Sequence, residues 1–285
     1  LRSEGSIGRA QPKLDRLHKL YLDDIESVRV GLGKPNAAAP AGFGLKPDEL
    51  TDEKLDELAA RVESAYKNLK ITLSLEESAN DCDYYIESMA EIPEDKHVFY
   101  RNLNEVLEDK TIVMTNSSTL LPSTFKVDFT KPERYLALHF ANNIWRSNSA
   151  EVMGHDGTSQ AAYDEAVEFA KSLHMVPIKV LKEQPGYLLN SMLVPFLNSA
   201  QYLLANGIGD HENIDMAWKI GTGAPYGPFQ ILDIVGLTTA YNIVANHPEA
   251  NDPTTNAGKI AAILKKYIDA GKTGVNAGEG FYKYR

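Results

Sequence analysis

Short, continuously apolar runs alternate with helix-like stretches over residues 69–181, and this alternation constrains the fold more than any other feature of the chain. Five runs predict strands, at residues 69–75, 84–89, 111–116, 135–140 and 176–181. Several contain an uninterrupted apolar stretch, which is typical of strands covered on both faces. Residues 96–107 and 161–173 carry apolar residues at helical spacing. The pattern predicts βαβ units and an α/β domain built on a mostly parallel sheet.

After Gln184, Pro185 and Gly186 the pattern changes to helices. Residues 187–205 are apolar on nearly every face and contain Pro195, which predicts a buried, kinked helix. Residues 215–220, 229–244 and 257–270 predict further helices, and the next strand candidate is the final F-Y-K-Y-R. We therefore expect two domains, 1–183 and 184–285. A helix that is apolar all round needs more cover than this segment supplies, so we expect a homodimer through the helical domain, with a compact helical bundle as the alternative.

The first 68 residues predict a helical hairpin, at about residues 9–68, that projects from the sheet. Residues 14–30 and 48–69 predict charged amphipathic helices, joined by a loop rich in Gly, Ala and Pro whose tip we expect to be mobile. Two glycine pairs, Gly5 with Gly8 and Gly31 with Gly33, follow no predicted strand. We expect both pairs in loops.

Charge and composition exclude several classes of function. The net charge of −10 leaves no basic stripe that would neutralise the phosphates of a nucleic acid. The single cysteine, Cys82, excludes an internal disulfide and fits a reducing cytoplasm. No apolar run approaches the ~18 residues that span a bilayer, and no signal peptide is visible. We expect a cytoplasmic protein without nucleic-acid or membrane partners, and we assign no metal ligands.

His139 ends the apolar run at residues 135–140, and Glu151 follows twelve positions later. A His at the end of a buried strand can meet a carboxylate from the next turn, which would fix its tautomer and orientation. The stretch T-N-S-S-T at residues 115–119 supplies hydroxyl and amide groups for a substrate oxygen. These groups suit removal of a proton from an alcohol as a hydride leaves its carbon. The alternative is a core His capped by a surface Glu.

Six short motifs follow one another from residue 87 to the C-terminus. They are E-S-M-A-E at 87–91, N-S-S-T at 116–119, H-F-A-N-N at 139–143, P-G-Y-L-L-N-S at 185–191, G-A-P-Y-G-P-F at 223–229 and G-E-G-F-Y-K-Y at 278–284. In order and spacing they resemble EAxxE, N-T/S-S-S/T, HFFNP, PGFxxNR, GxPMGPF and GEGFYxY of the 3-hydroxyacyl-CoA dehydrogenase family, of the 3-hydroxybutyryl-CoA dehydrogenase type. The resemblance implies a Rossmann-like domain that binds NAD(P), followed by an all-helical dimerisation domain.

The resemblance also implies roles for individual residues. His139 would be the general base toward the 3-hydroxyl group in oxidation and the acid in reduction. Glu151 would orient His139 and stabilise its imidazolium form. Ser118 and Asn190 would hydrogen-bond the reacting oxygen or the thioester end. Asn142 would support the base and the substrate carbonyl.

On the cofactor side, the resemblance implies that Glu91, Lys96 and Asn116 line the nicotinamide ribose. Structural alternatives stay open for these residues and for Ser118. Asn116 and Ser118 can cap the following helix, and Lys96 can be one charge on a solvated face. We expect Asp233 to serve the fold and the dimer rather than the chemistry.

The sequence departs from the family at two places. The family opens with a strand, a G-x-G-x-x-G turn and a second strand, and nothing here fits, so we expect that a unit of roughly 30 residues is missing before Leu1. Arg2 and Ser3 would then fall where dinucleotide specificity is read and would favour the 2′-phosphate of NADP(H), although Glu4 weakens that expectation. The second departure, H-F-A-N-N for HFFNP, removes a Phe and a Pro beside the base, which reshapes the entry of the acyl chain.

The leading hypothesis is an NAD(P)-dependent dehydrogenase that interconverts a short (S)-3-hydroxyacyl-CoA, such as 3-hydroxybutyryl-CoA, and the 3-ketoacyl-CoA. One alternative keeps the mechanism and replaces the thioester with a free hydroxy acid. Another is a non-catalytic dimeric scaffold or ligand-binding protein that lacks the glycine loop. The joint presence of a base, its acidic partner and two polar substrate contacts argues against this last alternative.

Overall fold

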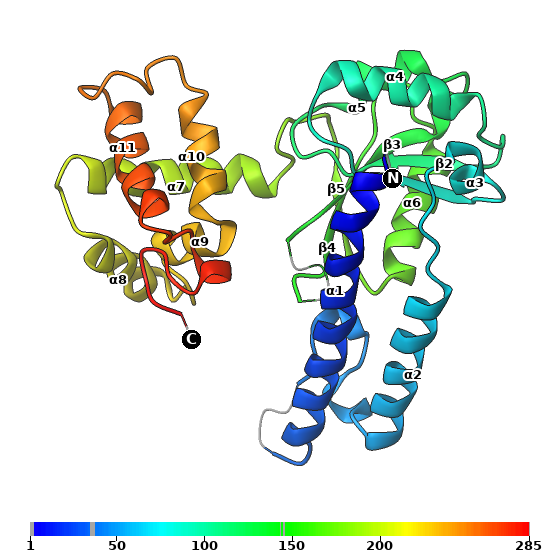
Figure 1. Cartoon of the computed structure of the whole chain (residues 1–285), viewed down its shortest axis with the longest axis horizontal. Helices are drawn as coiled ribbons and strands as arrows, with labels where there is room; N and C mark the ends of the chain where they lie inside the picture. The colour runs from blue at the N-terminus through cyan, green and yellow to red at the C-terminus, as the bar shows by residue number, and fades with distance from the viewer. Residues whose placement is uncertain (1–2, 35–37, 143, 145, 285) are drawn as a thin grey trace. The chain divides into compact units, whose positions relative to one another are not determined.

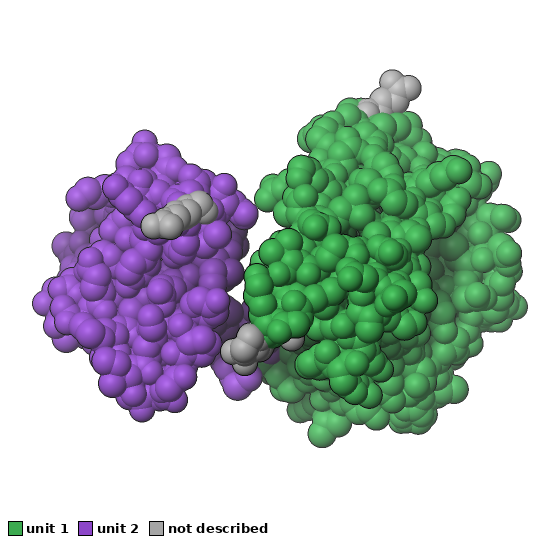
Figure 2. All heavy atoms as spheres, turned by 90° about the horizontal axis from the view of Figure 1, so that it is seen from below, with its two compact units in different colours: residues 1–188 green, residues 189–285 purple. Residues whose placement is uncertain are grey.

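The computed structural model describes the 285-residue chain except for residues 1–2, 35–37, 143, 145 and 285. The chain divides into two compact units, Leu1–Leu188 and Leu189–Arg285, which carry different colours in Figure 2. The first unit holds the sheet and the second is helical (Figure 1). The division falls shortly after residues 184–186, where the sequence changes character.

The first unit contains a five-stranded sheet in the order β1-β2-β3-β4-β5. Its strands are β1 (Tyr84–Glu87), β2 (Ile112–Thr115), β3 (Tyr135–Phe140), β4 (Ser149–Met153) and β5 (Val176–Val180). The pairs β1–β2, β2–β3 and β4–β5 are parallel, and β3–β4 is antiparallel. The predicted α/β class with a mostly parallel sheet is therefore confirmed. The carboxyl ends of β1, β2 and β3 lie at one edge of the sheet, where open α/β sheets bind ligands.

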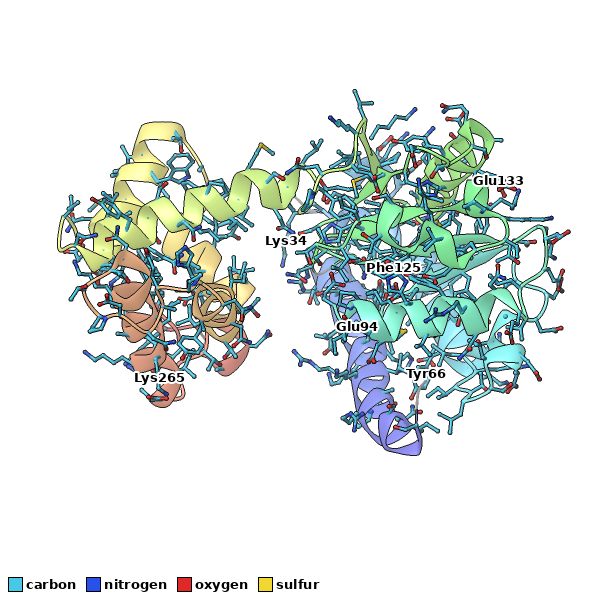
Figure 3. The ribbon with its side chains drawn as sticks, turned by 90° about the horizontal axis from the view of Figure 1, so that it is seen from above. Lys34, Tyr66, Glu94, Phe125, Glu133 and Lys265 are labelled. Carbon is cyan, nitrogen blue, oxygen red and sulfur yellow. The ribbon has the colours of Figure 1, made fainter. Side chains whose placement is uncertain are left out.

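Helices cover both faces of the sheet, which explains why β2 is buried at every position. Ile112 and Met114 pack in one cluster with α6 (Gln160–Ser172). Val113 points to the other face and packs in a cluster with α4 (Pro93–Asn104) and α5 (Pro122–Phe125). Phe125 of that second cluster lies among the side chains of the first unit (Figure 3). Because successive side chains of a strand point to opposite faces, β2 contributes to two separate hydrophobic cores.

A pair of long helices, α1 (Glu4–Gly31) and α2 (Asp52–Asn68), forms the predicted hairpin (Figure 1). The connection contains two short 3₁₀ turns, η1 (Ala41–Phe43) and η2 (Pro47–Glu49). Ile25, Phe43 and Leu55 form the hairpin's own small core. The prediction that Gly5 and Gly8 lie in a loop is wrong, because α1 runs through both. Each of these glycines makes the helix less stable by about 1 kcal/mol than alanine would at the same position.

Two strand predictions fail for identifiable reasons. Residues 69–75 form no strand, because the hydroxyl of Ser74 accepts a hydrogen bond from the backbone N–H of Glu77 and starts the short helix α3 (Leu75–Ala79). Among the described residues, none of the five strands pairs with residues 69–75. In the opposite direction, β4 was not predicted, because Ser149 and Glu151 break its apolar pattern. The carbonyl and amide groups of β4 are nevertheless paired on both sides, with β3 and β5.

The second unit consists of helices around one core. They are α7 (Leu189–Ala205), α8 (His211–Thr222), α9 (Pro228–Val235), α10 (Leu237–Ala245), α11 (Asn256–Asp269) and the 3₁₀ turn η5 (Val275–Ala277). The predicted single helix at 229–244 is divided at Gly236, whose φ of +94° breaks the helical backbone. Residues 281–284 form no strand, and Lys283 makes an isolated bridge with Glu279; Arg285 lies outside the described residues. The prediction that α7 is buried all round is also wrong within this chain, because Met192 is 66% exposed.

Two buried aspartates hold the second unit together without any charged partner among their described contacts. Asp215 on α8 accepts hydrogen bonds from the backbone N–H groups of Phe229 and Gln230 at the start of α9. Asp233 on α9 accepts hydrogen bonds from the backbone N–H of Phe281 and Tyr282, at 2.9 Å each, and from the hydroxyl of Tyr284. The C-terminal segment is thereby fixed onto α9.

Among the helices that the structure describes, none is long and apolar enough to cross a membrane. Charged side chains such as Lys265 on α11 and Glu133 in the 3₁₀ turn η4 (Pro132–Arg134) lie exposed on the surfaces of their units (Figure 3).

Candidate active site

His139 and Glu151 face each other across two neighbouring strands. They are register partners in the antiparallel pair β3–β4, and Nδ1 of His139 lies 3.1 Å from Oε2 of Glu151. Both side chains are buried. The sequence predicted this pair, but it placed Glu151 on a turn. The sheet supplies both residues instead, so the two side chains point to the same face.

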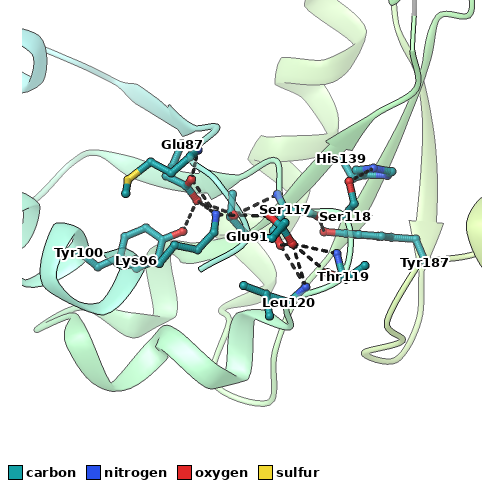
Figure 4. Close-up of polar contacts among 12 residues, drawn as sticks. Glu87, Glu91, Lys96, Tyr100, Ser117, Ser118, Thr119, Leu120, His139 and Tyr187 are labelled. Carbon is teal, nitrogen blue, oxygen red and sulfur yellow. Dashed lines mark hydrogen bonds and ion pairs between the residues drawn. The ribbon is translucent and has the colours of Figure 1, made fainter. Parts of the chain in front are cut away.

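Ser118 approaches the opposite side of the imidazole. Its hydroxyl lies 3.3 Å from Nε2 of His139 (Figure 4). Because a carboxylate can only accept, the Glu151 contact assigns the proton to Nδ1 of a neutral His139. Nε2 is then left as the acceptor, and it faces a hydroxyl group.

Asn116 links the ends of two parallel strands. It directly follows β2, and its Oδ1 accepts a hydrogen bond from the backbone N–H of Phe140 at the end of β3. The next helix, α5, has Leu121 as its N-cap and no side-chain cap. The alternative that Asn116 or Ser118 caps that helix is therefore wrong.

Tyr187 covers His139 and was not predicted as a site residue. Its ring stacks on the imidazole with the centroids 4.5 Å apart and an interplanar angle of 11°. Its hydroxyl donates to the backbone carbonyl of Ser117 at 2.7 Å. The following N–H, from Leu188, donates to Oε1 of Glu151 at 2.9 Å. Tyr187 has a φ of +53°, and a non-glycine residue held in this region costs roughly 1–3 kcal/mol.

A buried ion pair lies beside these groups. Lys96 is fully buried, and its ammonium donates to both carboxylate oxygens of Glu87, at 2.7 and 2.8 Å. Tyr100 and Thr115 also donate to Glu87 (Figure 4). The alternative of Lys96 on a solvated face is therefore wrong. Sequence reasoning missed Glu87 as a partner, although an acidic residue that ends an apolar strand is a signal for a buried charge.

Glu91 organises the loop that follows β2. Its Oε2 accepts hydrogen bonds from the hydroxyls of Ser117 and Thr119, at 2.6 and 2.9 Å. Partial burial alone would raise the pKa of Glu91, but these hydrogen bonds and the charge of Lys96 outweigh it, so the pKa lies below its ordinary value. Its other oxygen, Oε1, lies 3.7 Å from Nζ of Lys96. Glu91 is therefore an anion at neutral pH, with one oxygen committed to the loop.

The remaining predicted residues belong to other parts of the chain. Asn142 follows β3 and is exposed. Asn190 is half-buried in the first turn of α7, in the second unit. Ser3 is the N-cap residue of α1 and its hydroxyl contacts that of Ser6 rather than ending a strand, while Arg2 lies outside the described residues. Their functional roles stay predictions.

The described residues fit one half of a nicotinamide dinucleotide. Glu91, Asn116 and His139 follow or end the parallel strands β1, β2 and β3 at the edge where such cofactors bind. Glu91 and Asn116 present carboxylate and amide groups there, a chemistry that suits the hydroxyls of a ribose. In the described part of the chain no strand leads into a glycine-rich turn and a helix that would hold the pyrophosphate. No group of three His, Cys, Asp or Glu side chains among the described residues is arranged to hold a metal ion.

Comparison with known proteins identifies the class and then the family. Residues 46–184 match the family model described as 3-hydroxyacyl-CoA dehydrogenase, NAD binding domain, which makes the chain an NAD-binding oxidoreductase. Residues 186–284 match the C-terminal domain of the same family. The chain thus belongs to the 3-hydroxyacyl-CoA dehydrogenase family, as the sequence motifs predicted.

Three proteins are similar to this chain over most of its length. The human mitochondrial hydroxyacyl-coenzyme A dehydrogenase is 31% identical over 100% of this chain and 98% of its own length. A 3-hydroxybutyryl-CoA dehydrogenase of Bradyrhizobium diazoefficiens is 28% identical over 93% of this chain and 87% of its own length. A solved diketoreductase, described as acting on dicarbonyl compounds, is 38% identical with a TM-score of 0.79, covering 100% of this chain and 88% of its own.

Proposed function

We propose that this chain interconverts a secondary alcohol and a ketone by hydride transfer, with His139 as acid and base and Glu151 as its partner. The observation that carries the proposal is the buried pair itself, with Nδ1 of His139 held 3.1 Å from Glu151 and Nε2 facing a hydroxyl group. When bound, NAD⁺ supplies the nicotinamide that accepts the hydride from the carbinol carbon.

The protein's part of the reaction is the transfer of one proton. In oxidation Nε2 of His139 takes the proton of the substrate hydroxyl, and in reduction the imidazolium returns it to the ketone oxygen. Glu151 remains an anion, holds the Nδ1–H tautomer and stabilises the imidazolium. Ser118 would hydrogen-bond the reacting oxygen, and Asn190 and Asn142 would support the substrate.

On the cofactor side, Glu91, Lys96 and Asn116 would line the nicotinamide ribose. Oε1 of Glu91 would accept a hydrogen bond from a ribose hydroxyl. The ammonium of Lys96, 3.7 Å away, partly balances the negative charge of this carboxylate. Asn116 would also fix the position of the end of β3, because its Oδ1 accepts a hydrogen bond from the N–H of Phe140. The preference of Arg2 and Ser3 for NADP(H) remains a proposal that cofactor kinetics can test.

For the substrate we propose a short (S)-3-hydroxyacyl-CoA and its 3-ketoacyl-CoA. The match of both domains to the 3-hydroxyacyl-CoA dehydrogenase family supports this choice, as does the similarity to a 3-hydroxybutyryl-CoA dehydrogenase over 93% of this chain. Ala141 and Asn143, in place of the second Phe and the Pro of the HFFNP motif, leave the preferred acyl chain to be measured.

A second candidate is a free dicarbonyl or hydroxy-acid substrate with no CoA. The 38% identity to a diketoreductase over the whole chain favours it. The acid–base chemistry would be the same, since both substrates present a ketone to Nε2 of His139. The two candidates differ only in what lies beyond the reacting carbons.

Assembly and location are also proposals. Exposed apolar side chains in the second unit, such as Met192 and Ile220, support a homodimer through the helical domain. Sedimentation equilibrium would measure a mass of twice 31.5 kDa if this is correct. The single cysteine supports a reducing compartment such as the cytoplasm.

The test is oxidation of NADH and, separately, NADPH by the purified protein with acetoacetyl-CoA or with acetylacetone, a free 1,3-diketone. Turnover with the thioester alone supports the acyl-CoA assignment, and turnover with the diketone alone supports the second candidate. His139→Gln controls for a contaminating activity. No turnover with any of the four combinations would contradict the proposed catalysis.

A further inference from the structure

Tyr187 and the residue after it contact both members of the acid–base pair. Its ring lies flat on the imidazole of His139. Its hydroxyl is bound to the carbonyl of Ser117, directly before Ser118. The next residue, Leu188, holds Glu151 through its N–H. One short segment therefore contacts the base, its acidic partner and the backbone directly before Ser118.

Each contact restricts a different motion. The bond from Nδ1 to Glu151 fixes the direction of the imidazole but leaves the ring free to tilt about that axis. A parallel ring at 4.5 Å removes this tilt, because an inclined imidazole would collide with it. The Tyr187 hydroxyl fixes the backbone that sets the distance from Ser118 to Nε2. Burial raises the pKa of Tyr187, so the hydroxyl stays protonated and remains a donor.

We propose that Tyr187 is a positioning residue that holds His139 in its Nδ1–H tautomer with Nε2 aimed at the substrate oxygen. This proposal rests on the proposed role of His139 as acid and base. The ring and the hydroxyl act separately. In the PGFxxNR motif a Phe stands at this position and would supply the ring alone, so the tie to Ser117 is a feature of this chain.

The left-handed backbone of Tyr187 also supports a positioning role. A bulky residue at φ +53° persists only where its surroundings fix it. Here the stack, the hydroxyl bond and the neighbouring N–H supply three such constraints. Tyr187 is also almost completely buried, at 1% exposure.

The test compares Tyr187→Phe, which keeps the ring, with Tyr187→Leu, which removes it. Tyr163→Phe is the matched control, because the Tyr163 hydroxyl also donates to a backbone carbonyl, that of Val152, at 3.0 Å. Each variant is measured for kcat and KM, for Tm, and for the tautomer of His139 by ¹⁵N NMR of histidine-labelled protein. The His139 signals are assigned by their loss in His139→Gln.

For Tyr187→Leu we expect kcat to fall by about 10–100-fold with KM within about threefold of the parent, since misplacement of a reacting group acts on the chemical step. The ¹⁵N shifts should change from one tautomer to a mixture. Tyr187→Phe should keep the tautomer and lower kcat by about threefold, and Tyr163→Phe should match the parent.

An unchanged kcat and an unchanged tautomer in a folded Tyr187→Leu would overturn the proposal. If that variant does not fold, Tyr187→Phe decides: a kcat equal to that of Tyr163→Phe overturns it, and a selective loss supports it. If the parent has no activity with any substrate, the proposed function fails, while the tautomer measurement still decides whether Tyr187 positions the imidazole.

Discussion

Both units of this protein bury carboxylates, but they surround them with different partners. In the first unit Glu87 faces a lysine ammonium and Glu151 faces an imidazole. In the second unit Asp215 and Asp233 receive only backbone N–H groups and tyrosine hydroxyls among their described contacts. The first kind of pairing sets an acidic side chain against a basic one near the carboxyl ends of β1 and β3. The second kind fixes the path of the chain through N–H and hydroxyl donors.

The sharpest way to break this comparison is to remove the titratable partner in the first unit. His139→Gln should lower kcat by ~10²–10⁴-fold, because no group then accepts the substrate proton. The Tm should change little, since an amide fits at the same position. His97→Gln is the matched control, because His97 also meets a carboxylate, Asp128, at 2.5 Å but lies outside the cluster. Equal activity in the two variants would remove the base assignment.

The second largest effect should come from the buried ion pair. Lys96→Met leaves Glu87 buried without its cation and should lower the free energy of unfolding by about 3–5 kcal/mol in a urea titration. The double variant Glu87→Gln with Lys96→Met should recover part of that loss. Lys110→Met is the control: Lys110 pairs with Asp81 at 2.8 Å on the surface, and such pairs contribute roughly 0–1 kcal/mol. Similar losses for the two lysines would contradict the importance of burial.

In the second unit the corresponding change should affect stability alone. Asp233→Asn turns an amide NH₂ toward donors that now bind a carboxylate, which should cost about 1–3 kcal/mol of unfolding free energy. The kcat of the folded protein should be unchanged. Asp269→Asn, on the surface of α11, should be neutral within about 0.5 kcal/mol. A fall in kcat with unchanged stability would show that the second unit's carboxylates also serve the chemistry.

The smallest expected effect concerns pH. The pKa of folded Glu91 lies below its ordinary value of 4.5, so the anion stabilises the folded state. This stabilisation is fully present above pH ~4.5, and it is lost as the pH falls through the lower, folded pKa. Glu91→Gln should therefore flatten the dependence of Tm on pH in the acid range and leave the slope near neutrality unchanged. An identical acid slope in parent and variant would contradict the assignment.

The sequence predicted those strands that consist mainly of apolar residues. β2 and β3 were predictable because both faces are covered, so their apolar runs are continuous. β4 was not, because a strand that carries Glu151 in its middle has no such run. Residues 69–75 failed in the opposite sense, since an alternating pattern cannot reveal that Ser74 starts a helix.

The candidate site was predictable only where a motif named its residues. His139, Glu151 and Ser118 follow from motif and spacing, and the structure brings all three together. Tyr187 could not be found in this way, because its contact with His139 depends on a left-handed backbone after Gly186 that no periodicity signals. The burial of Lys96 was equally hidden, since a charged residue on a helix is usually solvated.

The cross-strand placement of His139 and Glu151 has a consequence for how such an enzyme can diversify. Strand register, rather than the connection at residues 141–148, sets their encounter, so that connection can gain or lose residues while the pair stays opposed. Grafting connections of other lengths and sequences between β3 and β4 would vary the surroundings of an unchanged His139–Glu151 contact. Under the proposed function, such variants would separate changes in substrate preference from changes in the His139–Glu151 pair.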